Sequence, residues 1–152
     1  MDNIKIKISR PFGPSYAHAQ IPTRVVDKLN EYIDKTINDK VKKSKLDFGP
    51  NLVGDVTQEI RLEREICEKS GWLNFLGNCI DKWMEIELKK KITKLNILDT
   101  WIVRQFKNEY NPIHWHNGHI SGAGFLKIPS TFGKHVQKKN KNYYGGSLSL
   151  IN

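Results

Sequence analysis

The chain has 152 residues and a mass of 17.6 kDa, which fits one domain. Hydrophobic residues make up 38% and charged residues 27%, so we expect a packed core and no wholesale disorder. No apolar run reaches the ~18 residues of a membrane-spanning helix, and the first residues lack a secretory hydrophobic segment. Two cysteines without a metal-binding spacing make a disulfide scaffold unfavourable. We therefore expect a cytoplasmic protein (in the host cytoplasm if viral) with no membrane partner.

The charge is strongly positive. Lysine and arginine number 25 against 16 aspartate and glutamate residues, for a formal net charge of +9. Such an excess attracts nucleic acid, an anionic protein or an anionic small molecule. The lysines gather in three runs between apolar segments, at residues 40–45, 89–94 and 134–141. This distribution is typical of solvated turns and helix ends, so nucleic-acid binding stays open without being favoured.

The first part of the chain reads as one strand followed by helices. Residues 4–8 alternate isoleucine with polar residues, which predicts a half-buried strand. Apolar residues three and four apart predict a helix over residues 22–37, followed by a lysine-rich loop that ends at residue 50. Residues 53–66 are ambiguous between a strand and a short helix. A longer helix with an apolar side then extends to residue 87, and Ser70 is its expected N-cap.

The last third of the chain changes character. Residues 97–106 are rich in β-branched and aromatic side chains, which predicts a strand. Residues 120–128 and 146–151 predict two further strands. Helices followed by strands favour an α+β fold with an antiparallel sheet.

Three of the five histidines fall within six residues, at His114, His116 and His119. On a strand, His114 and His116 project from the same face, and two imidazoles on one face can bind the same divalent ion. Pro112 and Gly118 bracket the pair with turn residues, as at a strand end where a rigid sheet presents functional side chains. The alternative is a pair of ordinary surface or core histidines, and a tight metal site needs a third ligand.

The third ligand decides which metal such a pair would hold. Another histidine suits zinc, iron or copper, whereas a carboxylate completes the facial triad of iron(II) oxygenases. The nearby candidates are His119, His135, Asp99 and Glu109, none with a compelling spacing. A closed structural zinc site is disfavoured because the chain has no CxxC motif. The GxSxG, P-loop and GxGxxG motifs of other enzyme classes are also absent.

The histidine segment resembles a known family. Residues 110–116 read YNPIHWH and residues 120–129 read ISGAGFLKIP. Together they resemble the core motif, approximately YNPxHxH and then SGVxYLKxP, of 2-oxoglutarate- and iron(II)-dependent oxygenases from bacteria and marine phages. Two weaker matches precede it: FGP with the helix that follows, and LVGDVTQE at residues 52–59, which resembles the family's LxGxxxQE stretch. The resemblance touches most of the chain, in order.

This resemblance implies helices followed by a double-stranded β-helix, or jelly roll. It implies iron(II) held by His114 and His116, with 2-oxoglutarate as co-substrate and hydroxylation as the reaction. Residues 1–95 would be the N-terminal strand and helical lead-in, and residues 96–152 the first jelly-roll strands, within one structural domain. The family's distal histidine and carboxylate-binding arginine come in a later segment. We therefore expect an N-terminal portion of the oxygenase domain or a truncated relative, and whether this chain is an enzyme stays open.

The resemblance also points to residues around the iron. Phe125 stands where relatives carry a tyrosine, so it cannot donate a hydrogen bond to 2-oxoglutarate, but Lys127 could supply a cation there. Tyr110 and Asn111 are expected at the pocket mouth, in contact with a protein or small-molecule substrate, although Asn111 also suits a turn. Two other functions remain. One is a catalytically inactive jelly-roll binding module, and the other is a basic nucleic-acid-binding protein with incidental histidines.

Overall fold

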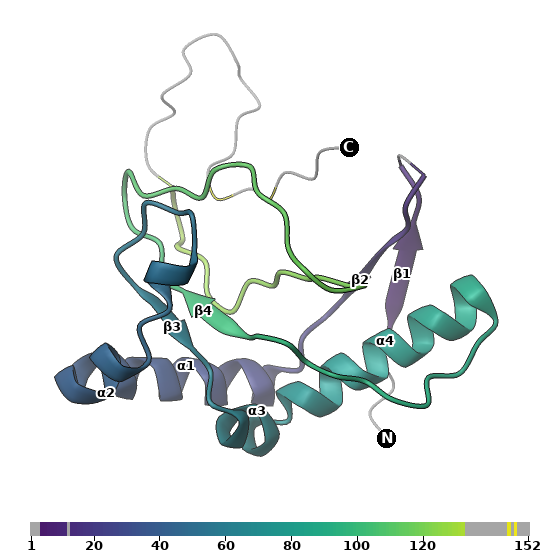
Figure 1. The fold of residues 1–152 in the computed structure, drawn as a ribbon, viewed down its shortest axis with the longest axis horizontal. Helices are drawn as coiled ribbons and strands as arrows, with labels where there is room; N and C mark the ends of the chain where they lie inside the picture. Colours follow the sequence, from purple (N-terminus) through teal and green to yellow (C-terminus); the bar gives the residue numbers. More distant parts are fainter. Residues whose placement is uncertain (1–3, 12, 133–145, 147, 149–152) are drawn as a thin grey trace, which may run out of the picture.

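The computed structural model describes residues 4–11, 13–132, 146 and 148. These residues form a mixed α/β structure in which two small antiparallel strand pairs lie over a layer of helices (Figure 1). In chain order the elements are β1 (Ile6–Ser9), β2 (Tyr16–Ala19), α1 (Thr23–Asn38), α2 (Lys40–Lys45), the 3-10 helix η1 (Gly49–Asn51), β3 (Glu59–Arg61), α3 (Arg64–Ser70), α4 (Trp72–Leu88) and β4 (Trp101–Val103). Within the described ranges the strands close no barrel, so the jelly roll stays a prediction.

Helix α1 is the base on which the other elements pack. Its buried residues Val25, Leu29, Ile33 and Thr36 recur every three or four positions, and this places them on one face. Val25 and Leu29 belong to a buried cluster that includes Cys67 of α3, while Ile33 belongs to a second cluster with β3. The predicted helix over residues 22–37 is therefore confirmed. No helix among the described residues is long and apolar enough to cross a lipid bilayer.

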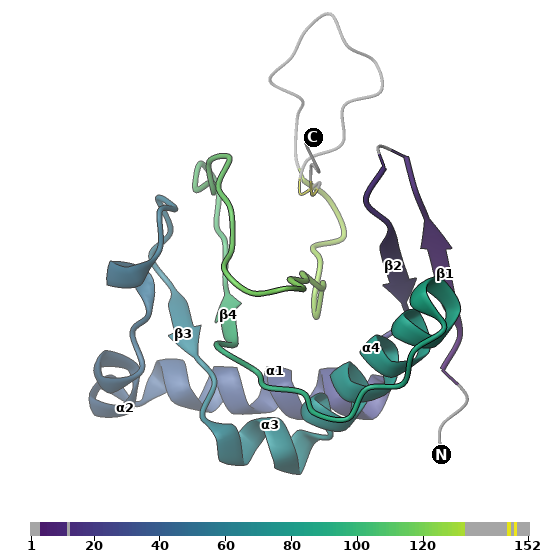
Figure 2. The ribbon, with the colours of Figure 1, turned by 45° about the vertical axis from the view of Figure 1, so that its right-hand side comes forward.

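The two strand pairs stand at opposite ends of the helical layer (Figure 2). Strand β1, which confirms the predicted N-terminal strand, pairs with β2. Strand β3 pairs with β4, with Ile60 directly opposite Ile102, and both side chains pack in the second cluster. Because side chains alternate along a strand, Glu59 and Trp101 project from the other face of this pair. The β3–β4 pair thus joins the helical lead-in to the segment that carries the histidines.

The prediction of a lysine-rich loop after α1 is wrong, because residues Lys40–Lys45 of that segment form helix α2. The Asp39 carboxylate accepts hydrogen bonds from the backbone N–H groups of Val41 and Lys42, both at 3.0 Å. This N-cap satisfies two of the free donors at the start of a short helix.

The long helix begins one residue later than predicted. Ser70 ends α3, and Gly71, with a φ of 86°, is the N-cap residue of α4. The Ser70 hydroxyl still accepts a hydrogen bond from the Trp72 N–H at 3.3 Å. The ambiguous residues 53–66 contain β3 and the start of α3, so both readings were partly right.

The predicted strand over residues 120–128 is also wrong. These residues join no strand pair in the described part of the chain. The segment is held instead by Leu126, whose side chain packs on the α1 cluster and whose carbonyl accepts a hydrogen bond from Asn30 at 3.2 Å. Of the predicted strand at 146–151, only residues 146 and 148 lie among the described residues, and neither is in a strand.

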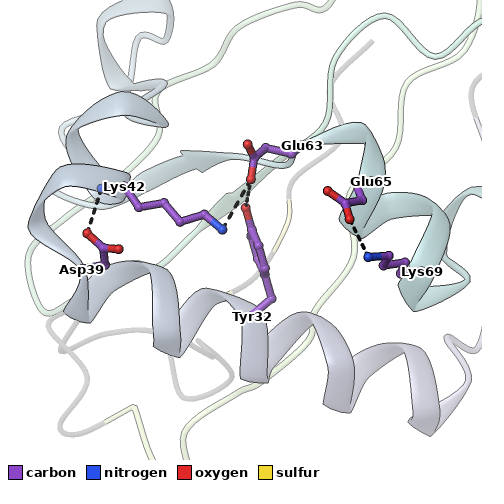
Figure 3. Close-up of polar contacts among 6 residues, drawn as sticks. All are labelled: Tyr32, Asp39, Lys42, Glu63, Glu65 and Lys69. Carbon is purple, nitrogen blue, oxygen red and sulfur yellow. Dashed lines mark hydrogen bonds and ion pairs between the residues drawn. The ribbon is translucent and has the colours of Figure 1, made fainter.

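A polar cluster ties α2 and the start of α3 to α1 (Figure 3). The Tyr32 hydroxyl donates to the Glu63 carboxylate at 2.9 Å, and the Lys42 ammonium lies 3.4 Å from the same carboxylate. Lys42 also lies 4.5 Å from the centre of the Tyr32 ring. Burial, together with the hydrogen bond to Glu63, raises the pKa of Tyr32. The tyrosine therefore stays a neutral donor across the physiological pH range.

We expect Leu29→Ala to lower the free energy of unfolding by about 2–5 kcal/mol, because Leu29 is buried where α1 meets α3. The measurement is urea denaturation followed by circular dichroism. The control is Val41→Ala on the exposed side of α2, which should change stability by at most about 0.5 kcal/mol. Equal losses in the two variants would show that α1 is not the centre of the packing.

Candidate metal centre

The two predicted metal ligands lie against each other. The Nε2 atoms of His114 and His116 are 3.0 Å apart, and the ring centres are 4.7 Å apart at an angle of 75°. The His114 Nδ1 atom lies 2.7 Å from the carbonyl oxygen of Pro112. Since a carbonyl only accepts, Nδ1 carries the proton and Nε2 keeps its lone pair, the form in which histidine binds a metal.

The distance between the nitrogens fits a particular coordination geometry. An imidazole nitrogen lies about 2.0–2.1 Å from a bound divalent ion, so neighbouring octahedral ligands are about 2.8–3.0 Å apart and tetrahedral ligands about 3.3–3.4 Å apart. The observed 3.0 Å matches the octahedral corner. Without a metal the same distance is a hydrogen bond, in which His116 donates to His114. Metal binding therefore requires His116 to move its proton from Nε2 to Nδ1.

The histidines do not lie on a strand, which corrects the reason given for their pairing. Tilted contacts between aromatic rings position them instead. The Phe48 ring lies 5.3 Å from the Trp101 ring, and Trp101 lies 5.6 Å from the ring of His116. Trp101 belongs to β4, so the sheet face opposite the core sets the position of the pair. Trp115, between the two histidines, is 87% exposed.

Glu109 holds the turn that leads into the histidines. Its carboxylate accepts hydrogen bonds from the Thr57 hydroxyl at 2.6 Å, from the Thr57 N–H at 3.1 Å and from the Phe106 N–H at 2.7 Å. These bonds, that from the Thr57 hydroxyl first, lower the pKa of Glu109. Next to it, the backbones of Asp55 and Tyr110 form a β-bridge. Glu109 is therefore a structural anchor of this loop.

The other three residues predicted as a possible third ligand are Asp99, His119 and His135. Asp99 pairs with Arg61 at 2.7 Å, and His119 is exposed. His135 lies outside the described residues. Among the described residues, no three His, Cys, Asp or Glu side chains form a group that could hold a metal ion. The structure thus brings together the predicted pair without a third convergent ligand in this part of the chain.

The predicted co-substrate residues lie on the solvent side of their segment. Leu126 packs inward, so its neighbours Phe125 and Lys127 point outward and are exposed. Neither residue makes a hydrogen bond, ion pair or ring contact with the histidines in the part of the chain that the structure describes. Of the predicted substrate residues, Tyr110 is 58% exposed and Asn111 packs tightly over Gly54.

Sequence reasoning missed Glu59, which is 2% exposed. Neither of its carboxylate oxygens has a hydrogen-bond partner. Burial raises the pKa of Glu59, and the charges of Asp47 and Glu109 raise it further. Glu59 ends the LVGDVTQE stretch, but nothing in that stretch shows that its side chain would be buried.

We compared the chain with protein-family models, with curated proteins and with solved structures, and none of the three gave a match. Any assignment of function therefore depends on the histidine motif and on the geometry described above.

We expect Gly54→Ala to lower the free energy of unfolding by about 1–3 kcal/mol, since a Cβ atom at this position would lie 2.0 Å from the Asn111 amide oxygen. Gly77→Ala in α4 is the matched control, because its Cβ atom would meet no atom within 4 Å. An alanine in the middle of a helix should raise stability by about 0.5–1 kcal/mol. Urea denaturation measures both, and a gain for Gly54→Ala would contradict the tight packing of Asn111.

Proposed function

We propose that this chain is the iron-binding part of a 2-oxoglutarate-dependent oxygenase, with His114 and His116 as two of the metal ligands. The observation that carries the proposal is the 3.0 Å separation of their Nε2 atoms. The backbone carbonyl of Pro112 fixes the metal-binding form of His114. Two imidazoles at neighbouring octahedral corners would supply the two histidines of an iron(II) facial triad, which also requires a carboxylate. The residues therefore fit two of the three ligand positions.

The chain's own residues would position and shield the metal. When bound, iron(II) with 2-oxoglutarate would supply the chemistry by which dioxygen, the oxidant, hydroxylates a substrate while 2-oxoglutarate is oxidatively decarboxylated. Tilted ring contacts from Phe48 through Trp101 to His116 give the exposed histidine pair an aromatic support on one side. The Glu109 hydrogen bonds hold the approach to His114, so the two rings keep their relative orientation.

The co-substrate and the substrate would contact exposed residues of the two segments that carry the motif. 2-Oxoglutarate is a dianion, so a chain with a net charge of +9 attracts it over long range. We assign Lys127 as the cation for its far carboxylate, with Phe125 as the apolar neighbour on the same side of the segment. Tyr110 and Asn111, directly before the histidines, are the residues that we assign to substrate contact.

The test is an anaerobic calorimetric titration of the full chain with iron(II), with and without 2-oxoglutarate. We expect binding of one iron per chain that tightens when 2-oxoglutarate is present. His114→Ala should weaken it about 100-fold or more, because one ligand is lost. The matched control is His18→Ala on the exposed strand β2, which should bind like the unchanged chain.

Two results would contradict the proposal. If the unchanged chain binds no iron(II), the chain fits the alternative of an inactive binding module. If His114→Ala binds as tightly as the unchanged chain, the metal sits elsewhere and the histidine pair is incidental.

A further inference from the structure

A pocket of about 370 Å³ is lined by the start of α1 and the first two turns of α4. Ile4, in the segment before β1, adds a third side. The Lys82 ammonium of α4 holds this segment in place, because it donates a hydrogen bond to the Ile4 carbonyl at 2.7 Å. The volume lies in the range of small-molecule pockets, roughly 300–1,000 Å³. None of the described residues that line it belongs to the candidate metal centre.

The deep part of the pocket is apolar. Ile4, Val25 and Phe75 line it, and each is at most 9% exposed. Val25 belongs to the buried cluster on α1, and the Phe75 ring stacks on the Trp72 ring with their centres 5.6 Å apart. These contacts fix the side chains in position, so the pocket offers a preformed aliphatic and aromatic surface to the apolar body of a ligand.

The rim of the pocket is polar and carries one positive charge. Asn74 and Asn78 are exposed and lie four residues apart, on the same face of α4. The Arg24 guanidinium lies beside the start of this face, because a Cβ atom built on Gly71 would be 3.7 Å from Arg24 Nη2. The described lining residues include no carboxylate, and Arg24 has no ion-pair partner in the part of the chain that the structure describes.

We propose that this pocket binds a small organic carboxylate with an apolar body. The planar guanidinium of Arg24 binds the carboxylate through two parallel hydrogen bonds, and the amide N–H groups of Asn74 and Asn78 donate to the same oxygens. The apolar body packs on the buried side chains below. One guanidinium balances one negative charge, which favours a carboxylate over a doubly charged phosphate ester. The inference is independent of the proposed function, since it involves no metal.

The probe is benzoate, which is added to the full chain and followed by the NMR shifts of the backbone amides. We expect the amides of Gly71, Asn74 and Asn78 to shift and to saturate with a Kd of about 1 mM or lower. Benzamide has the ring without the charge, and acetate has the charge without the ring. Each should bind at least about 10-fold more weakly than benzoate, because one half of the recognition is missing.

The variant is Arg24→Gln, which we expect to bind benzoate about 10-fold or more weakly than the unchanged chain. The matched control is Arg64→Gln on α3, where the arginine side chain is 86% exposed. Both substitutions remove one positive charge, so the comparison cancels the long-range attraction of the basic chain for anions. Arg64→Gln should bind benzoate like the unchanged chain. Asn78→Leu is the second variant should Arg24→Gln not fold, and it should weaken binding in the same direction.

Four results would overturn the proposal. They are no saturating shift at the pocket with benzoate in large excess, equal affinity for benzamide, equal affinity of Arg24→Gln and Arg64→Gln, and tighter binding of phenyl phosphate than of benzoate. Shifts confined to the amides around His114 and His116 would place the probe elsewhere and count as the first of these. Because the titration contains no iron(II), its failure leaves the proposed function to its own test.

Discussion

The packing of α1 against the β3–β4 pair is the constraint on which the rest of this structure depends. Leu29 and Ile33 on α1 form the centres of two buried clusters, and Ile60 and Ile102 pack against them from the sheet. Since side chains alternate along a strand, burying these isoleucines turns Glu59 and Trp101 to the opposite face. A hydrophobic contact far from the histidines thus decides which side chains are available to them.

The site is built on that opposite face by two kinds of interaction. The ring contacts from Phe48 through Trp101 set the position of His116, and the Glu109 hydrogen bonds set the path by which the chain reaches His114. None of these groups is a proposed metal ligand. They orient His114 and His116, which are the proposed ligands. The histidine pair consequently holds its 3.0 Å separation without being part of a strand.

Charge acts on two scales in this protein. The excess of lysine and arginine over the whole chain attracts anions from a distance. At the buried Glu59, by contrast, the charges of Asp47 and Glu109 raise the pKa of the carboxyl, so the local field there is negative. Lys42, from one of the lysine runs that raised the possibility of nucleic-acid binding, is engaged within the fold by Glu63 and Tyr32. The net charge of the chain therefore predicts the electric field at long range, but it does not predict the charge around an individual residue.

The sequence by itself determined the elements with a clear period, the N-terminal strand and α1, because local spacing suffices for these. It also named His114 and His116 as a candidate pair, but the strand expected to align them is absent, and the contact with Trp101 positions His116 instead. It did not show α2, whose formation depends on the Asp39 cap, nor that residues 120–128 would stay unpaired, because strand pairing needs a partner elsewhere in the chain. Only the tertiary structure decided that Glu109 is an anchor and that Glu59 is buried. Burial and long-range contact are properties of the folded chain, and no spacing within one segment records them.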